Sequence, residues 1–225
     1  MLEKFQNLNI SEVIIRALNE MGFEEPTPIQ AESIPVAMSG SDMIGQAQTG
    51  TGKTAAYGIP VLEKILKAEP SKDIQTVVLS PTRELAMQID QQMEGFSYFM
   101  PASSVAVYGG NDGIRFEQEK KGLTLGADVV IATPGRLISH LSLGYVDLSK
   151  VSFFILDEAD RMLDMGFAED IMQIVKYLPK ERQTIMFSAT MPTKIQQLAK
   201  TILTNPVEVK LAVSKKNTLP VLDTA

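Results

Sequence analysis

Apolar and polar positions follow one another along this chain in a repeating order. A short, nearly continuous apolar run comes first, then a turn, then a longer stretch whose apolar residues have helical spacing. Nearly continuous apolar runs are typical of strands buried on both faces, as in parallel sheets. The predicted strands are 43–44, 74–79, 104–108, 128–132, 151–156, 184–187 and 207–211.

Helical stretches separate these runs. One starts at Lys53, and another contains Leu85, Ile89, Met93 and Phe96 at helical spacing. The alternation predicts an α/β fold with a mostly parallel central sheet and helices on both faces. Right-handed crossovers would then bring ligand-binding residues to the carboxyl ends of the strands. The predicted core helices are 82–99, 135–143, a stretch from 160, and 193–203, besides the helix from 53.

Two further helices are expected before this core. Asn9 is a candidate N-cap for the first, with Glu12 three residues later. Thr27 and Pro28 supply a cap and a preset first turn for the second. Residues 212–225 are interpreted as a linker or as a tail added for expression.

Composition narrows the class of protein. The chain has 225 residues, of which 44% are apolar and 21% charged, so one sizeable globular domain is expected. It has no cysteine, which excludes disulfides and cysteine-ligated zinc. We find neither a membrane-length apolar run nor a signal-peptide pattern, so a cytoplasmic, non-membrane protein is expected. The net charge of −6 argues mildly against a nucleic-acid partner.

The segment Ala47–Thr54, Ala-Gln-Thr-Gly-Thr-Gly-Lys-Thr, is typical of a phosphate-binding loop between a strand and a helix. Gly50 and Gly52 permit the backbone angles that turn successive N–H groups toward an anion. Lys53 can reach the outer phosphates, and the Thr54 hydroxyl can bind Mg²⁺. The common pattern has glycine where this chain has Ala47. The alternative is a glycine-rich turn with a solvated lysine.

Two carboxylates, Asp157 and Glu158, follow the apolar run 153–156. A strand that ends there would place them at the carboxyl edge of the sheet, beside the phosphate loop. Asp157 would hold Mg²⁺, and Glu158 would polarise the attacking water. The alternative is that they only cap the next helix. Ser188-Ala189-Thr190 ends another strand and can hydrogen-bond the acidic pair, or simply cap a helix.

Together these motifs resemble the first RecA-like domain of DEAD-box ATP-dependent RNA helicases, over about residues 5–211. Ala at position 47 is usual in that family, which accounts for the departure above. The segment 22–30 resembles its adenine-reading Q motif, Asp157-Glu158-Ala159-Asp160 the motif that names the family, and Ser188-Ala189-Thr190 its coupling motif. The RNA-contacting segments are matched by Pro81, Thr82, Arg83, Gly109, Gly110, Thr133, Pro134, Gly135 and Arg136.

The resemblance implies a role for each group of residues. Lys53, Asp157 and Glu158 would be catalytic, Thr54 and Asp157 would hold Mg²⁺, and Asp160, Ser188 and Thr190 would couple ATP to RNA. Phe5 would stack on the purine, or else be a core aromatic; Arg83 and Arg136 would bind RNA phosphates, or else pair within the protein. ATP would be bound by Phe5, Phe23, Thr27, Gln30, Ala47, Gln48, Thr49, Gly50, Thr51, Gly52, Lys53 and Thr54.

The expected domain plan is a RecA-like ATP-binding domain at 1–211, with 1–38 as its Q-motif region. The arginine motif of the family's second RecA-like domain does not occur in this sequence, so a partner domain is expected to be missing and the chain alone weakly active. The expected function is ATP-driven, sequence-independent separation of RNA strands by a monomer. An RNA clamp without unwinding is the alternative; a P-loop kinase or a DNA translocase fits less well. His140, the single histidine, is interpreted as a surface or core-edge residue.

Overall fold

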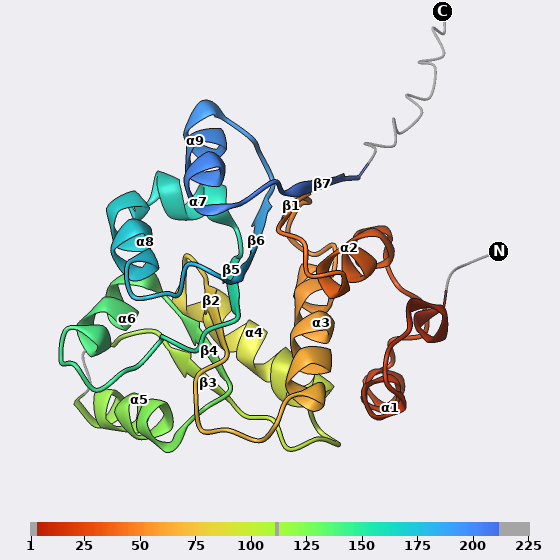
Figure 1. Ribbon diagram of the computed structural model, residues 1–225, viewed down its shortest axis with the longest axis horizontal. Helices are drawn as coiled ribbons and strands as arrows, with labels where there is room; N and C mark the ends of the chain where they lie inside the picture. The colour runs from red at the N-terminus through yellow and green to blue at the C-terminus, as the bar shows by residue number, and fades with distance from the viewer. Residues whose placement is uncertain (1–3, 111–112, 212–225) are drawn as a thin grey trace, which may run out of the picture.

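A seven-stranded sheet, parallel throughout, forms the centre of the protein in the computed structural model, which describes residues 4–110 and 113–211. The strand order is β3-β4-β2-β5-β6-β1-β7, and every pairing is parallel. The sheet crosses the middle of the molecule in Figure 1. The strands are β1 Met43–Gln46, β2 Thr76–Leu79, β3 Ser104–Val107, β4 Val129–Ala132, β5 Phe153–Leu156, β6 Gln183–Ser188 and β7 Val207–Lys210.

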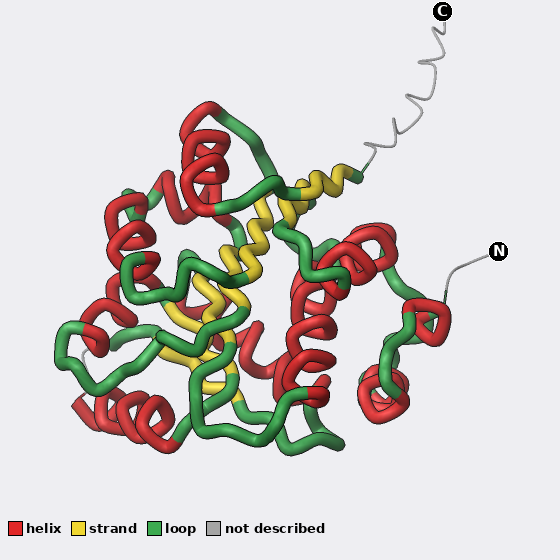
Figure 2. Tube along the Cα trace, viewed as in Figure 1, coloured by secondary structure: helices red, strands yellow, loops and turns green. Residues whose placement is uncertain are grey.

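Helices cover both faces of the sheet (Figure 2). One apolar cluster joins one sheet face to α1–α4, and a second joins the other face to α5–α9. The helices are η1 Phe5–Leu8, α1 Glu12–Glu20, α2 Pro28–Met38, α3 Lys53–Lys67, α4 Arg83–Phe96, α5 Gly113–Leu125, α6 Pro134–Leu141, α7 Ala159–Asp164, α8 Ala168–Val175 and α9 Thr193–Ile202.

The strands are buried on both faces, which explains their uninterrupted apolar sequence. In β2, Val77 packs in one cluster and its neighbour Val78 in the other, and both are at most 1% exposed. Because successive strand residues point to opposite faces, a strand between two helical layers needs apolar side chains at every position. The α/β fold expected from the sequence is therefore confirmed.

All strands run in the same direction, so all their carboxyl ends lie at one edge of the sheet. The phosphate loop follows β1, the two carboxylates follow β5, and the Ser188–Thr190 motif begins at the last residue of β6. The segments that follow β2, β3 and β4 contain Pro81, Gly109 and Thr133. We call these two halves the β1–β5–β6 edge and the β2–β3–β4 edge.

Several local expectations are wrong. Asn9 does not cap the first helix: it adopts the left-handed conformation after η1, and Ser11 precedes α1. The stretch from 160 is two helices, since α7 ends before Gly166, whose φ is +85°. The helix expected over 82–99 ends at Phe96.

Helix α5 was not predicted, whereas Thr27 and Pro28 do begin α2 as expected. Residues 212–225 lie outside the described residues. Within the described parts of the chain, no helix combines the length and apolarity that crossing a bilayer requires.

Candidate active site

The phosphate loop connects β1 to α3 and has the backbone that anion binding requires. Gly50 and Gly52 have φ values of +83° and +89°, in the left-handed region that other residues rarely adopt. A Cβ at Gly52 would also lie 2.4 Å from Gln30 Nε2, so a larger residue here would displace the Gln30 side chain. The loop leads directly into Lys53, the first residue of the 15-residue helix α3. Its N–H groups and the helix N-terminus therefore favour a phosphate group here.

Lys53 meets both carboxylates that follow β5. Its Nζ lies 3.4 Å from Asp157 Oδ1 and 3.9 Å from Glu158 Oε1, and all three side chains are at least nine-tenths buried. These contacts are ion pairs without hydrogen-bond geometry: neither Lys53 Nζ nor Asp157 Oδ1 has a hydrogen-bond partner among the described residues. The sequence-based expectation that residues 53, 157 and 158 converge is confirmed.

Unpaired buried polar atoms of this kind call for an explanation, because most buried polar groups are hydrogen-bonded. A triphosphate with Mg²⁺ would supply the missing partners, with phosphate oxygens for Lys53 Nζ and a cation for Asp157 Oδ1. Neither here nor elsewhere in the described residues do three or more His, Asp and Glu side chains gather where they could hold a metal ion by themselves. The site thus fits a cation held by few protein ligands and by phosphate oxygens, the usual arrangement for Mg²⁺ in nucleotide sites.

Glu158 is held in an uncommon backbone conformation, with φ 54° and ψ 51°. This left-handed conformation costs free energy for a residue with a side chain, and such residues concentrate at functional sites. The carboxylate accepts a hydrogen bond from Thr49 Oγ1 at 2.7 Å and another from Arg161 Nη1 at 3.2 Å. One bond comes from the phosphate loop and one from the Arg161 side chain, and Glu158 makes no side-chain cap hydrogen bond to the first N–H groups of α7, so the capping alternative is wrong.

Asp157 has a second fixed neighbour, the hydroxyl of Tyr57 on α3. Tyr57 Oη donates to Asp157 Oδ2 at 3.0 Å, and both residues are buried. Burial raises the pKa of Asp157, and the nearby Lys53 charge opposes that rise. Burial, together with the adjacent Asp157 charge, raises the pKa of Tyr57 well above its ordinary value. The hydrogen bond to Oδ2 leaves Oδ1 facing Lys53.

The Ser188–Thr190 motif pairs with the last acid of the Asp157–Asp160 segment. Thr190 donates to Asp160 Oδ2 from its backbone N–H at 3.0 Å and from its hydroxyl at 2.8 Å. Partial burial raises the pKa of Asp160, but the hydrogen bonds from Thr190 outweigh it and the net shift is downward. The expected hydrogen bond from this motif to Asp157 or Glu158 is therefore wrong, because the acceptor is Asp160. The capping alternative is also wrong, because α9 is preceded by Pro192.

The Q-motif segment packs directly against the phosphate loop. Gln30 accepts from the Thr27 N–H at 2.9 Å and donates to the Gly52 carbonyl at 3.0 Å, while Thr27 Oγ1 donates to the Thr51 carbonyl at 2.9 Å. Phe5 is only 2% exposed and meets Phe23 edge to face, with 6.5 Å between ring centroids. The structure therefore places Phe5 in the core, as the alternative expected, and its stacking on a purine stays a prediction.

The residues predicted to contact RNA all lie at the β2–β3–β4 edge. Thr82 caps α4 by accepting from the Leu85 N–H at 3.3 Å, and Arg83 is exposed, 5.8 Å from the Tyr108 ring centroid. Gly109 follows β3 with φ +59°. Thr133 precedes α6 without making a side-chain cap, which leaves the first N–H groups of that helix without a side-chain partner from it.

Arg136 pairs within the protein, as the alternative expected. Its Nε donates to Glu119 Oε2 at 2.6 Å, and its side chain is 15% exposed. Of the two interpretations of His140, surface or core edge, the surface one is wrong. It is fully buried, contacts Glu119 Oε2 through Nε2 at 2.9 Å, and pairs with the Tyr145 hydroxyl through Nδ1.

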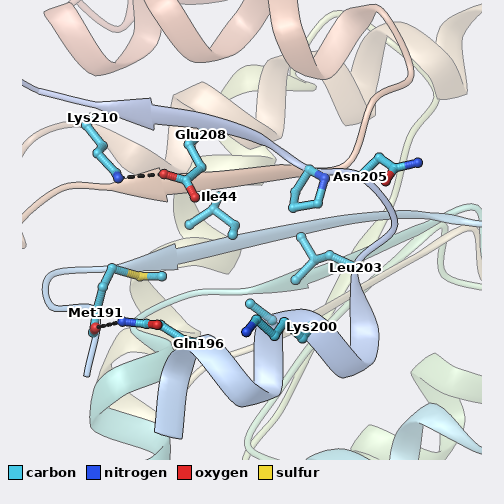
Figure 3. Close-up of a pocket in the computed structure, with 10 residues that line it drawn as sticks. Ile44, Met191, Gln196, Lys200, Leu203, Asn205, Glu208 and Lys210 are labelled. Atoms are coloured by element: carbon cyan, nitrogen blue, oxygen red, sulfur yellow. Dashed lines mark hydrogen bonds and ion pairs between the residues drawn. The ribbon is translucent and has the colours of Figure 1, made fainter. Parts of the chain in front are cut away.

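A separate hollow of about 540 Å³ lies between α9 and the strands β1 and β7 (Figure 3). Polar groups at its rim pair with one another: Lys210 Nζ lies 2.5 Å from Glu208, and Gln196 Nε2 donates to the Met191 carbonyl at 2.9 Å. None of the residues predicted as catalytic or binding lines this hollow. The candidate active site is therefore assigned from the buried charges around Lys53 rather than from the hollow.

Sequence reasoning missed Tyr57, Arg161 and Glu119. From the sequence pattern, Tyr57 is indistinguishable from the apolar residues around it on a buried helix, and Glu119 is indistinguishable from a solvated charge. A signal exists for Arg161, since it follows Glu158 by three residues near the start of a predicted helix, a spacing at which side chains of opposite charge can meet.

The known proteins that this chain resembles belong to one family. A family model described as DEAD/DEAH box helicase matches residues 27–198. The "DEAD-box ATP-dependent RNA helicase CshA" of Bacillus subtilis is 44% identical, over 92% of this chain and 41% of that protein. The "ATP-dependent RNA helicase DeaD" of Escherichia coli is 45% identical, over 92% of this chain and 32% of that protein.

Solved structures agree with these matches. A DEAD box protein from Methanococcus jannaschii superposes with a TM-score of 0.85 at 37% identity, over 92% of this chain and 55% of that one. A hypothetical ATP-dependent RNA helicase from Sulfolobus tokodaii gives a TM-score of 0.81 at 37% identity, over 90% and 57%. The chain spans less than half the length of the two curated relatives named above.

Proposed function

Because the chain belongs to the DEAD/DEAH box helicase family, we propose that it is the ATP-binding half of an ATP-dependent RNA helicase. It would bind ATP with Mg²⁺ at the β1–β5–β6 edge and an RNA backbone at the β2–β3–β4 edge. The observation that carries the proposal is the buried Lys53 Nζ at the end of the glycine-rich loop. It faces the carboxylates of Asp157 and Glu158 and has no hydrogen-bond partner among the described residues.

Each residue at the β1–β5–β6 edge then has a role. Lys53 and the N–H groups of the phosphate loop bind the outer phosphates. Thr54 and Asp157 are the residues that would hold Mg²⁺, which when bound neutralises charge on the transferred phosphoryl group. Glu158 accepts a proton from the attacking water, and its contacts with Thr49 and Arg161 hold the carboxylate in place.

Adenine recognition is assigned to Gln30. A carboxamide offers one donor and one acceptor, which complement the N6 and N7 groups of adenine and not the O6 and N7 groups of guanine. Gln30 makes one bond through each of its two ends, to Gly52 and Thr27, so a second donor proton and a second acceptor lone pair are left for a base. The same residue would then sense the base and support the phosphate loop.

RNA would be held by backbone groups at Pro81–Arg83, Gly109–Gly110 and Thr133–Arg136. N–H groups at helix N-termini bind phosphate without a strongly basic surface, which is compatible with the net charge of −6. Contacts to the phosphate backbone carry no base identity, so binding would be independent of sequence. The 2′-hydroxyl would distinguish RNA from DNA.

The complete cycle is assigned to a longer protein with a second RecA-like domain. An arginine supplied across a domain interface accelerates related phosphoryl transfers about 10³- to 10⁵-fold. Residues 1–225 alone are therefore expected to bind adenine nucleotide and hydrolyse it slowly, as a cytoplasmic monomer. Both curated relatives described above are named RNA helicases, so the alternative of an RNA clamp without strand separation is not favoured.

The decisive test uses the 225-residue chain with fluorescent ADP and GDP in the presence of Mg²⁺, and with labelled single-stranded RNA. The proposal expects ADP to bind more tightly than GDP, and RNA to bind without sequence preference. Substitution Gln30→Ala should reduce the ADP preference. Equal binding of both nucleotides by the unsubstituted chain would contradict the assignment of Gln30, and no nucleotide binding at all would contradict the proposed function.

A further inference from the structure

A buried carboxylate beneath the β2–β3–β4 edge has no part in the chemistry described above. Glu119 on α5 is 2% exposed, and no motif of the sequence analysis includes it. Buried ionised groups cost free energy unless they are paired and hydrogen-bonded, so the partners of this one are informative.

Three donors satisfy Glu119. Oε1 accepts the backbone N–H of Tyr108 at 3.1 Å, and Oε2 accepts Arg136 Nε at 2.6 Å. Oε2 also contacts His140 Nε2 at 2.9 Å, and because an ionised carboxylate only accepts, Nε2 carries the proton. Burial raises the pKa of Glu119, but the bonds from His140 and Arg136 outweigh it and the net shift is downward, in accord with an ionised group.

Two of these donors lie in or directly beside segments assigned to RNA. Tyr108 is the residue before Gly109, and Arg136 lies in the first turn of α6. A single side chain therefore connects the turn after β3 to the N-terminus of α6. A break at Glu119 would let the two segments move relative to each other.

A layer of aromatic contacts supports the same connection from the side. Phe116, one turn before Glu119 on α5, stacks on His140 with 4.2 Å between ring centroids and 14° between planes. The Arg136 guanidinium lies 4.6 Å from the Phe116 centroid. Arg115 approaches Glu119 Oε1 at 3.6 Å and lies over the Tyr108 ring at 4.1 Å. Helix α5 thus holds both ends of the connection.

We propose that Glu119 is a positioning residue for RNA binding: it fixes the turn at Gly109–Gly110 relative to the first turn of α6, so that N–H groups of both segments meet one RNA strand. The inference rests on the proposed RNA function. It also changes the role of Arg136, whose Nε is used to hold α6 in place. The competing account is that Glu119 merely withholds Arg136 from RNA phosphates.

The two accounts differ in the expected effect of removing the charge of Glu119. Removing a negative charge near an RNA site strengthens binding by electrostatics alone, whereas loss of positioning weakens it. Glu119→Gln and Glu117→Gln each remove one negative charge from α5, and Glu117 is exposed. Under the positioning account, Glu119→Gln raises the Kd for single-stranded oligouridylate about fivefold, a size typical of residues that act without touching the ligand. Glu117→Gln leaves that Kd unchanged or lowers it.

The test measures fluorescence anisotropy of the labelled RNA with the 225-residue chain, and the Kd for Mg·ADP as a check that each variant is folded. A second variant, Glu119→Asp, keeps the charge but withdraws the carboxylate by one methylene, and it too should weaken RNA binding with Mg·ADP affinity intact. If the Glu119→Gln variant binds the RNA as tightly as the Glu117→Gln variant, or more tightly, the positioning role of Glu119 is overturned and the proposed RNA function is not. Failure of the unsubstituted chain to bind the RNA overturns the proposed RNA function, and this inference with it.

Discussion

The two halves of the carboxyl edge use their charged side chains in opposite ways. At the β1–β5–β6 edge, Lys53 Nζ and Asp157 Oδ1 are buried and have no hydrogen-bond partner in the described part of the chain, and Glu158 has left-handed backbone angles. At the β2–β3–β4 edge, the central buried acid, Glu119, accepts from Tyr108, Arg136 and His140. The second half also has buried nitrogens without a hydrogen-bond partner among the described residues, Arg115 Nε and Arg136 Nη2. The two halves differ in their central acids: Asp157 keeps one oxygen for a ligand, whereas both oxygens of Glu119 hold backbone segments in place.

This difference follows from the chemistry that each half is proposed to perform. Phosphoryl transfer needs charges that meet the reacting atoms, and such charges stay only partly satisfied until the substrate arrives. Sequence-independent binding of a backbone needs N–H groups at fixed spacing, which requires a rigid support. Substitutions at the two halves should therefore fail in different ways.

The largest effect is expected from Glu158→Gln at the β1–β5–β6 edge. Loss of a general base should slow ATP hydrolysis about 10²- to 10⁴-fold in a protein that also carries the second domain. Nucleotide affinity should hardly change, because the amide retains an acceptor for Thr49 Oγ1. Steady-state ATPase rates and ADP binding measure the two effects. Turnover that survives the substitution would remove Glu158 from the role of base.

Lys53→Ala should weaken ADP binding about 100-fold, the equivalent of two charge-assisted hydrogen bonds to phosphate. RNA affinity should be unaffected, since Lys53 lies at the other half of the edge. Lys64→Ala is the matched control, because Lys64 is an exposed lysine on the same helix, α3. Equal losses of ADP affinity in both variants would mean that Lys53 acts only through net charge.

The sequence alone predicts most of the β1–β5–β6 edge, but little of the structure that supports the β2–β3–β4 edge. Strands such as β5 are apolar at every position, and motifs directly after such strands must lie at the carboxyl edge. Helix α5 gives no such signal: its buried residues include Glu119, while Ile114 and Leu125 are 69% and 65% exposed. An acid whose partners lie 11, 17 and 21 positions away cannot be recognised as buried from local pattern.

The start of α1 illustrates the same limit. Asn9 and Glu12 have the spacing of a local cap, yet the helix begins at Glu12, after Ser11. The Ser11 N–H donates to Glu63, which is 52 positions later on α3. A distant acid replaces the local one, and only the folded chain brings them together.

Tyr57→Phe should have a smaller effect at the β1–β5–β6 edge. It removes the hydroxyl that holds Asp157 Oδ2 and keeps the ring, which packs near Phe187. Loss of one hydrogen bond to a charged group should weaken Mg·ADP binding about tenfold. Binding of ADP without Mg²⁺ should change less, so titrations with and without Mg²⁺ measure the role of Tyr57. Equal weakening under both conditions would argue against an effect through Asp157.

The smallest expected effect is a difference in how the two halves respond to acid. The lowered pKa of Glu119 means that its contribution to stability is present above its unfolded value of 4.5 and is lost as pH falls through the folded pKa. The raised pKa of Asp157 has the opposite sign: between its unfolded value of 3.8 and its folded pKa, the native state binds more protons and stability falls as pH rises.

Urea unfolding at a series of pH values from 3 to 6 tests these signs. The gain in unfolding free energy over that range should shrink in Glu119→Gln and grow in Asp157→Asn, relative to the unsubstituted chain. Changes of the same sign in both variants would mean that the two acids do not differ in environment.

The most direct measurement is a ¹H–¹⁵N NMR titration of the chain, first with Mg·ADP and then separately with single-stranded RNA. The account predicts that Mg·ADP shifts the amides of 47–54 and that RNA shifts those of Gly109, Gly110, Thr133, Gly135 and Arg136. Nucleotide-induced shifts confined to the hollow between α9 and β7, or the same amides shifted by both ligands, would contradict the division of this edge into two sites.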